Sequence, residues 1–133
     1  MATSTVHPKK STTQKLTRNS KVFKTVLQAI ENKKGSDVIS IDLRKIGESV
    51  ADFFIVCQAG STTQVKAIGD EVEHLLATEC GEKPYKTEGR QGLQWVIIDY
   101  VNIVVHIMHP DARAFYKLEE MWQDADVVVH TTT

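Results

Sequence analysis

Hydrophobic residues recur along the chain with two different periods, and the period of each segment predicts its secondary structure. A first helix is predicted after Asn19 or Ser20, because either side chain can cap a helix. Its apolar residues form one stripe at helical spacing: Val22, Phe23, Val26, Leu27 and Ile30. Gly35 is placed to end this helix.

Two strands are predicted next. Between Asp37 and Leu43 apolar side chains alternate with polar ones, which is the period of a half-buried strand. The run from Phe53 to Cys57 is apolar throughout, as in a central strand that is buried on both faces.

A second helix is predicted from Ser61, where Ser61-Thr62-Thr63-Gln64 has the form of a capping box. Its apolar stripe consists of Val65, Ile68, Val72, Leu75 and Leu76. The stripe stops at Cys80 and Gly81, where the helix is expected to end.

The second half of the chain predicts three more strands. A short polar strand is expected around Tyr85 to Thr87, and a loop with two glycines follows at 88–92. The runs 95–100 and 103–108 are rich in β-branched residues, as strands are. Val101-Asn102 between them predicts a tight hairpin, although Val is poorly suited to the positive φ that such turns need.

These elements, with a last helix that starts at Pro110, follow one another in the order αββαβββα. The order indicates a single α/β domain with a mixed central β-sheet of about five strands, flanked by helices. The apolar stripe of the last helix consists of Phe115, Leu118 and Trp122.

Outside the domain, which we assign to residues 19–126, both ends are interpreted as tails. Residues 1–18 are rich in Thr, Ser and Lys and poor in large apolar side chains, which indicates a flexible basic tail. An organelle transit peptide is the alternative interpretation of this segment. Residues 127–133 are interpreted as a C-terminal tail.

The predicted hairpin has one apolar face and one mixed face. With a turn at Val101-Asn102, the apolar face carries Val96, Ile98 and Tyr100 opposite Ile107, Val105 and Ile103. The mixed face carries Trp95, Ile97, Asp99, Val104, His106 and Met108. Its polar groups would be costly to bury, so we expect this face to be at least partly open. Either it is a protein-recognition patch, rich in the Trp and Met of interfaces, or another helix covers it.

Composition and charge narrow the choice of partner. The chain has 133 residues, of which 41% are hydrophobic, as expected for one globular domain. Up to Ile30 there are six basic residues and no acidic one, whereas the rest holds ten Lys and Arg against seventeen Asp and Glu. The acidic domain is therefore expected to prefer a basic partner to a phosphate backbone. No apolar run approaches the ~20 residues that cross a bilayer, and no membrane is expected.

No constellation of nucleophile, base and stabiliser can be assembled from the sequence. Gly60-Ser61 could cradle a phosphate, but nucleotidyl transfer also needs paired carboxylates for a metal, and Asp99 stands alone. Cys57 lies in an apolar strand and is expected to be a buried small hydrophobe. The spacing of His106 and His109 does not direct both at one metal. We therefore expect no catalysis, no metal and no cofactor.

An ordered set of motifs resembles the ribosomal silencing factor family, also called the Iojap-like family. The motifs lie between Ser20 and Trp122: Asp52 to Cys57, Gly60-Ser61, Val65 to Ile68, Glu88-Gly89, Trp95 to Tyr100, Val104 to Ile107 and Phe115 to Glu119. Each motif alone is weak, whereas the set in this order is highly specific. The sequence departs from the family pattern at Val101-Asn102, where Gly-Asp is usual, and at Gln64, where His is common.

The resemblance implies a nucleotidyltransferase-like shape without catalysis. It also implies a translational repressor that binds the large ribosomal subunit through ribosomal protein fourteen. Such binding would block association with the small subunit and lower translation under nutrient limitation. The contact residues implied are Trp95, Ile97, Asp99, Tyr100 and His106. A cytoplasmic location, with mitochondrion or plastid as the alternative, and a possible homodimer are implied as well.

Two other functions remain open at the level of the sequence. One is a nucleotidyltransferase-like enzyme, against which the missing carboxylate pair argues. The other is an RNA-binding module that uses the basic tail, since the acidic core domain is expected to make no direct contact with nucleic acid.

Overall fold

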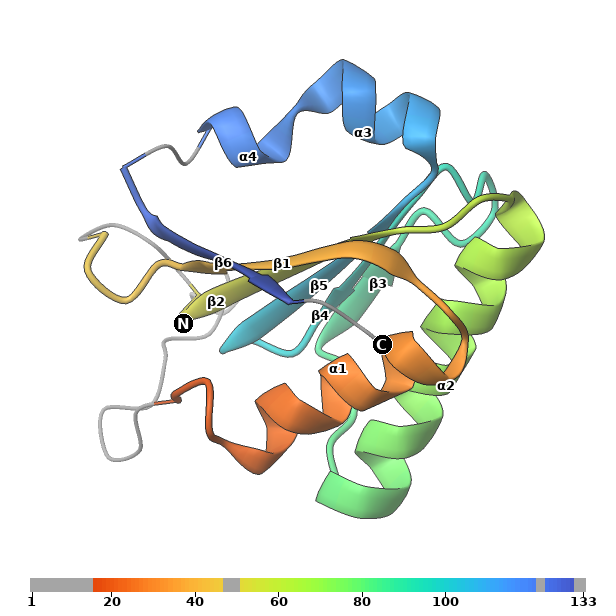
Figure 1. The fold of residues 1–133 in the computed structure, drawn as a ribbon. Coiled ribbons are helices and arrows are strands. Elements are labelled where there is room, and N and C mark those ends of the chain that lie inside the picture. Colours follow the sequence, from red (N-terminus) through yellow and green to blue (C-terminus); the bar gives the residue numbers. More distant parts are fainter. Residues whose placement is uncertain (1–15, 47–50, 122–123, 131–133) are drawn as a thin grey trace, which may run out of the picture.

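The structure is a computed structural model, and it describes residues 16–46, 51–121 and 124–130. Helices cover both faces of a six-stranded sheet (Figure 1). The strands are β1 (Ser36–Asp42), β2 (Phe53–Gln58), β3 (Lys86–Glu88), β4 (Trp95–Asp99), β5 (Ile103–Met108) and β6 (Asp126–His130). The helices are α1 (Lys21–Asn32), α2 (Thr62–Cys80), α3 (Pro110–Tyr116) and α4 (Leu118–Met121).

The strands lie in the order β3-β4-β5-β2-β1-β6. β2 and β5 are parallel, and the other neighbours are antiparallel, so the predicted mixed sheet of an α/β domain is confirmed. The structure has six strands rather than about five. The additional strand, β6, includes residues 127–130 of the segment interpreted as the C-terminal tail, and it pairs antiparallel with β1.

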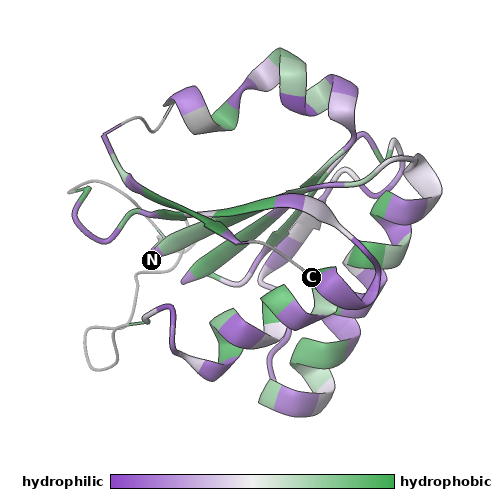
Figure 2. Cartoon of the chain, viewed as in Figure 1, coloured by the Kyte–Doolittle hydropathy of each residue, from purple (hydrophilic) through white to green (hydrophobic). Residues whose placement is uncertain are grey.

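The core has one part on each face of the sheet. Long helices α1 and α2 cover one face, and α3 and α4 lie over the other (Figure 1). Apolar residues line the strands between these layers, while the helices carry both hydrophobic and hydrophilic residues (Figure 2). The larger part includes Phe23, Ile30, Ile55, Ile68, Leu76 and Ile98, and the smaller part includes Ile39, Ile41, Val56, Met108 and Leu118. Both faces of the central strands are therefore buried, as the apolar run in β2 predicts.

The first helix does not end at a left-handed Gly35 as predicted. α1 stops at Asn32, and Lys34, not Gly35, takes the left-handed conformation with φ 63°. Gly35 is instead required by close packing, since a Cβ there would lie 2.5 Å from Cγ2 of Ile30.

The predicted cap of α2 is confirmed, and Gln64 gains a structural role. The backbone N–H of Gln64 donates to Ser61 Oγ at 3.1 Å, and the backbone N–H of Gly60 donates to the side-chain Oε1 of Gln64 at 2.7 Å. Gln64 Nε2 also donates to the carbonyls of Lys33 and Lys34 at 3.0 and 2.9 Å. Gln64 therefore ties the start of α2 to the end of α1.

The predicted last helix is interrupted at Lys117, where φ is 50°. α3 ends before this residue and α4 begins after it. Leu118 is buried as predicted, but Phe115 is 77% exposed, so its assignment to an apolar core stripe is wrong. Trp122, the third predicted member, lies outside the described residues.

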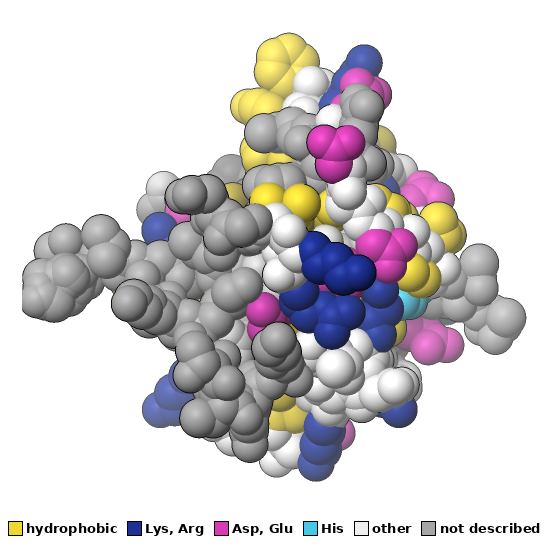
Figure 3. All heavy atoms as spheres, turned by 90° about the vertical axis from the view of Figure 1, so that its left-hand side faces the viewer, with side chains coloured by type: hydrophobic (Ala, Val, Ile, Leu, Met, Phe, Trp, Pro, Cys, Tyr) yellow, Lys and Arg dark blue, Asp and Glu magenta, His cyan; other side chains and the backbone are white. Residues whose placement is uncertain are grey.

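The chain contacts the domain before residue 19. Leu16 packs against the larger core, and Arg18 Nε donates to Ser40 Oγ at 2.8 Å. Arg18 and Arg44 both lie over the Phe53 ring, with guanidinium carbons 5.2 and 5.0 Å from its centre. In the side view of Figure 3, Lys and Arg side chains gather beside Asp and Glu side chains. Residues 1–15 of the predicted tail lie outside the described residues.

Candidate functional site

Four of the five predicted contact residues share one face of the sheet. Trp95, Ile97 and Asp99 alternate along β4, and His106 is paired with Ile97 from β5. Tyr100 lies on the opposite face, in the larger core. The predicted pairing of Val96 with Ile107 and of Ile98 with Val105, which fixes these faces, is confirmed.

The mixed face is less open than the sequence predicts. Trp95 and Ile97 are half-buried, but His106 and Asp99 are each only 5% exposed. Asp99 Oδ1 and His106 Nδ1 make local hydrogen bonds, which offset part of the cost of burial. Nε2 of His106 has no hydrogen-bond partner among the described residues.

Trp95 and His106 are joined directly. The indole Nε1 of Trp95 donates to Nδ1 of His106 at 3.0 Å, which requires a neutral imidazole with its proton on Nε2. Burial lowers the pKa of His106 to about 4, although the negative charge of Asp99 acts in the opposite direction. The His106 side chain is therefore neutral near pH 7, and it fixes the orientation of the indole.

Aromatic rings continue from this pair toward solvent. Ring centres are 4.5 Å apart for Phe54 and His106, 4.7 Å for Trp95 and Tyr116, and 4.9 Å for Tyr116 and Phe115. We call these five residues the aromatic cluster. Its inner end is packed against the sheet, whereas Tyr116 and Phe115 are 49% and 77% exposed.

The sequence prediction did not include the three members of the cluster that lie outside the hairpin. Phe115 and Tyr116 come from α3, and Phe54 from β2. An available signal was that Phe115 and Tyr116 are adjacent on a helix, so a stripe that buries one of them turns the other outward. The observed interruption at Lys117 could not be read from that spacing.

Asp99 supports the hairpin turn. Its Oδ1 accepts the amide of Val101 at 2.8 Å, and Val101 has φ 76°. The doubt that the sequence raised about Val in this turn is therefore justified, because a β-branched residue is strained at positive φ.

Tyr100 is a core residue in this structure, 8% exposed. Burial raises the pKa of its phenol, and among the described residues its hydroxyl has no hydrogen-bond partner. Tyr100 can affect a contact surface on the opposite face only by positioning β4.

The residues that the sequence offers for catalysis or phosphate binding have structural roles in the fold. Cys57 is fully buried, and burial raises the pKa of its thiol to about 12, as expected for a small hydrophobe. Ser61 caps α2. Within the described segments, no three His, Cys, Asp or Glu side chains are grouped to hold a metal, and no helix is suited to span a membrane.

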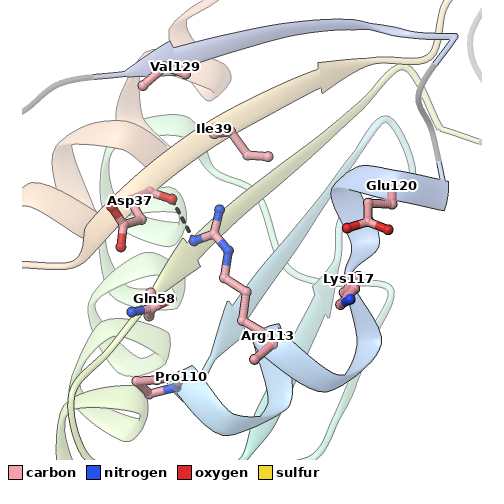
Figure 4. Close-up of a pocket in the computed structure, with 9 residues that line it drawn as sticks. Asp37, Ile39, Gln58, Pro110, Arg113, Lys117, Glu120 and Val129 are labelled. Atoms are coloured by element: carbon pink, nitrogen blue, oxygen red, sulfur yellow. Dashed lines mark hydrogen bonds between the residues drawn. The ribbon is translucent and has the colours of Figure 1, made fainter.

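A separate cavity of about 580 Å³ lies between α3, α4 and strands β1, β2 and β6. Figure 4 shows Arg113 reaching across it toward Asp37, whose carbonyl accepts from Arg113 Nη1 at 2.6 Å. Ile39 and Val129 contribute its apolar walls.

Comparison with known proteins matches residues 16–133 to a family described as "Ribosomal silencing factor during starvation". A Halalkalibacterium halodurans protein named ribosomal silencing factor RsfS is 36% identical over 110 residues, covering 83% of this chain and 92% of the relative. The Bacillus subtilis protein of the same name is 36% identical over 104 residues, with coverages of 78% and 86%. A crystal structure of a Chromobacterium violaceum protein superposes with a TM-score of 0.73 at 32% identity, covering 84% of this chain and 91% of that one.

Proposed function

The chain belongs to the ribosomal silencing factor family, and from that premise we propose that it represses translation by binding the large ribosomal subunit. The contact is ribosomal protein fourteen, at the face where the small subunit docks. The bound protein then blocks subunit association sterically, and translation falls under nutrient limitation. The family description and the relatives' names, both of which refer to ribosomal silencing, support the role.

The observation that carries the proposed contact is the partial exposure of the aromatic cluster. Phe115 and Tyr116 extend from the domain, and Trp95 is held behind them by His106. Aromatic side chains are enriched at interface cores because each covers a large area with few rotatable bonds. Trp95 is the proposed anchor, Phe115 and Tyr116 extend the surface beyond the hairpin, and Ile97 adds apolar area beside it.

Asp99 and His106 act in this proposal as positioning residues. Both are nearly inaccessible, and both make hydrogen bonds that fix the turn or the indole. Trp95 and Ile97 are more accessible to a partner than Asp99 and His106 are.

The charge of the domain favours the same partner class. Beyond Ile30 the chain carries ten basic and seventeen acidic residues, and ribosomal proteins are generally basic. Opposite net charges accelerate encounter, whereas a direct contact with RNA phosphates by the core domain would be disfavoured. The proposed site of action is the ribosome of the cytoplasm, with that of a mitochondrion or plastid as the alternative.

Blocking by steric exclusion needs no chemical step, so the proposed role is regulatory rather than enzymatic. Asp99 is the carboxylate that metal-dependent nucleotidyl transfer would use, and in this fold it accepts a hydrogen bond from the backbone N–H of Val101 in the hairpin turn. Purified protein is expected to turn over no nucleotide with magnesium or manganese. Turnover that Asp99→Asn abolishes would contradict this role.

The contact can be tested by measuring binding to purified ribosomal protein fourteen by interferometry. Trp95→Ala is expected to weaken binding by roughly 30- to 1,000-fold, the usual effect of removing a central Trp. Phe115→Ala removes a side chain that is 77% exposed, so it tests the surface without endangering the core. We expect a loss of about 10-fold for this variant.

Glu82→Ala, exposed after α2, is the control and should bind like the wild type. Folding of each variant is checked by circular dichroism. Wild-type affinity in both folded aromatic variants would overturn the proposed surface. Failure of the wild type to bind protein fourteen would overturn the proposed partner.

A further inference from the structure

The cavity between the sheet and α3 lies where two parallel strands end. β2 and β5 are parallel neighbours, and Gln58 at the end of β2 is paired with Met108 at the end of β5. α2 follows β2 on one face of the sheet, whereas α3 follows β5 on the other face (Figure 1). In open α/β sheets, ligands bind outside the carboxyl ends of the strands at such a reversal. Gln58 and Pro110, the first residue of α3, both line the cavity, so it occupies this position.

The volume and the walls of the cavity fit a small molecule with an apolar part. Ligand cavities usually have volumes of about 300–1,000 Å³, and this one has about 580 Å³. Ile39 and Val129 form its apolar wall on the strands, and Ala114 contributes apolar surface from α3 (Figure 4). Val129 is 68% exposed, so a ligand that covers it would remove apolar surface from water.

Two side chains of opposite charge lie together on the helical side of the cavity. The backbone N–H of Glu120 donates to the Lys117 carbonyl at 3.0 Å, and both side chains line the cavity (Figure 4). Within the described segments, neither of them forms an ion pair. An ammonium and a carboxylate are therefore presented side by side to a ligand.

The backbone at the cavity is held in an uncommon conformation at two places. Lys117 has φ 50°, and Asp37, on the opposite side of the cavity, has φ 49°. Left-handed residues other than glycine are uncommon, and they cluster at ligand sites, where the surrounding structure holds them.

The charges of the residues that line the cavity sum to zero. Arg113 and Lys117 are positive, and Asp37 and Glu120 are negative. Arg113 is 9% exposed, and its bond to the Asp37 carbonyl keeps it across the cavity. A ligand that carries both signs of charge complements this set better than one with a net charge.

We propose that this cavity binds a free α-amino acid with a large apolar side chain. The carboxylate of the ligand accepts from the ammonium of Lys117, and the ammonium of the ligand donates to the carboxylate of Glu120. The apolar side chain lies against Ile39 and Val129. None of the residues that line the cavity belongs to the aromatic cluster, so this proposal does not depend on the proposed ribosomal role.

Titration of the methyl-labelled full chain with L-phenylalanine, followed by NMR, tests the ligand class. The methyl signals of Ile39, Val129 and Ala114 should shift and saturate, with a Kd of about 0.1 to 1 mM. Phenylpropionate lacks the ammonium, and phenethylamine lacks the carboxylate. Each should bind about 10-fold more weakly or worse, because one charge-assisted hydrogen bond is lost. The absence of a saturable shift, or equal affinity for either truncated probe, would overturn the proposal.

Substitutions at the cavity test the location of the ligand. Ala114→Trp fills the cavity from an exposed position of α3 and should weaken phenylalanine binding by about 10-fold or more. Ala77→Trp, exposed on α2 at the other face of the sheet, is the matched control and should bind like the wild type. Equal affinity in the two tryptophan variants would exclude this cavity. If Ala114→Trp does not fold, nuclear Overhauser effects from the phenylalanine ring to Ile39 and Val129 in the wild type decide the location, and their absence excludes the cavity.

Lys117→Gln tests the assigned contact with the carboxylate. It should weaken the binding of phenylalanine by about 10-fold and leave that of phenethylamine unchanged, because only phenylalanine has the carboxylate. Equal losses for both probes would show that Lys117 does not bind the carboxylate.

Discussion

His106 is nearly inaccessible, and it accepts a hydrogen bond that only a neutral imidazole can accept. Its pKa of about 4 in the folded chain lies below the ordinary value of 6.5. Between these values the unfolded chain binds a proton that the native chain does not, so stability falls as the pH drops through this range.

His106→Gln is therefore expected to reduce the pH dependence of stability. Between pH 7 and pH 5 the free energy of unfolding of the wild type should fall by about 2 kcal/mol more than that of the variant. Urea denaturation at both pH values measures the difference. His74→Gln, at an exposed position of α2, is the control and should keep the wild-type slope. Equal slopes for wild type and His106→Gln would show that His106 is not neutral in the fold.

A substitution at Val101 is expected to stabilise the fold. Its φ of 76° strains a β-branched residue, and Gly adopts such a φ without strain. Val101→Gly should raise the free energy of unfolding by about 1 kcal/mol, after allowing for the greater freedom of Gly in the unfolded chain. The midpoint of urea denaturation measures this gain. A lower midpoint would mean that packing of the valine outweighs the strain.

For single residues, the sequence predicts which face of the hairpin each side chain lies on, but it does not predict how accessible each side chain is. Alternation places Trp95 and His106 on one face because the side-chain period of a strand is fixed. It does not reveal how far α3 covers that face, which depends on tertiary packing. Phe115 was misassigned for the same reason, since helical spacing does not show where a helix breaks.

At the level of the elements, β6 forms an edge strand of the sheet. It pairs with β1 along its whole length, and Val129 and Val127 are the partners of Ile39 and Ile41, which belong to the smaller core. A chain that ends at Ala125 should lose on the order of 3 kcal/mol of unfolding free energy, because strand pairing and valine contacts are removed together.

Chemical denaturation of this truncated chain tests the contribution of β6. Removal of residues 131–133 alone is the matched control and should have little effect. Unchanged stability after removal of 126–133 would show that β6 is an accessory strand.

Elements with strong patterns were predicted well, and those without were missed. α2 has both a capping box and a long apolar stripe, and its predicted start and end agree with the structure. β6 reads Asp-Val-Val-Val-His, which is too short and too uniform to show alternation. Its neighbour β1 lies far away in the sequence, so only tertiary structure reveals the pairing.

For the whole molecule, the separation of charge between the first thirty residues and the rest predicts a salt-sensitive encounter. The domain is acidic, and the proposed partner is basic. The association rate constant with ribosomal protein fourteen should fall by about 10-fold between low and physiological salt, while the dissociation rate constant changes less. Stopped-flow or interferometry at two salt concentrations measures both constants. A rate that rises with salt would contradict electrostatic complementarity.

The formation of whole ribosomes from separated subunits measures whether the bound protein blocks subunit association. Large subunits are incubated with the protein, small subunits are added, and the joined fraction is measured on sucrose gradients. We expect the wild type and Glu82→Ala to reduce joining, whereas folded Trp95→Ala and Phe115→Ala should leave the subunits free to join. Full inhibition by both folded aromatic variants would rule out the aromatic cluster as the contact surface, and no inhibition by the wild type would rule out the proposed block of subunit association.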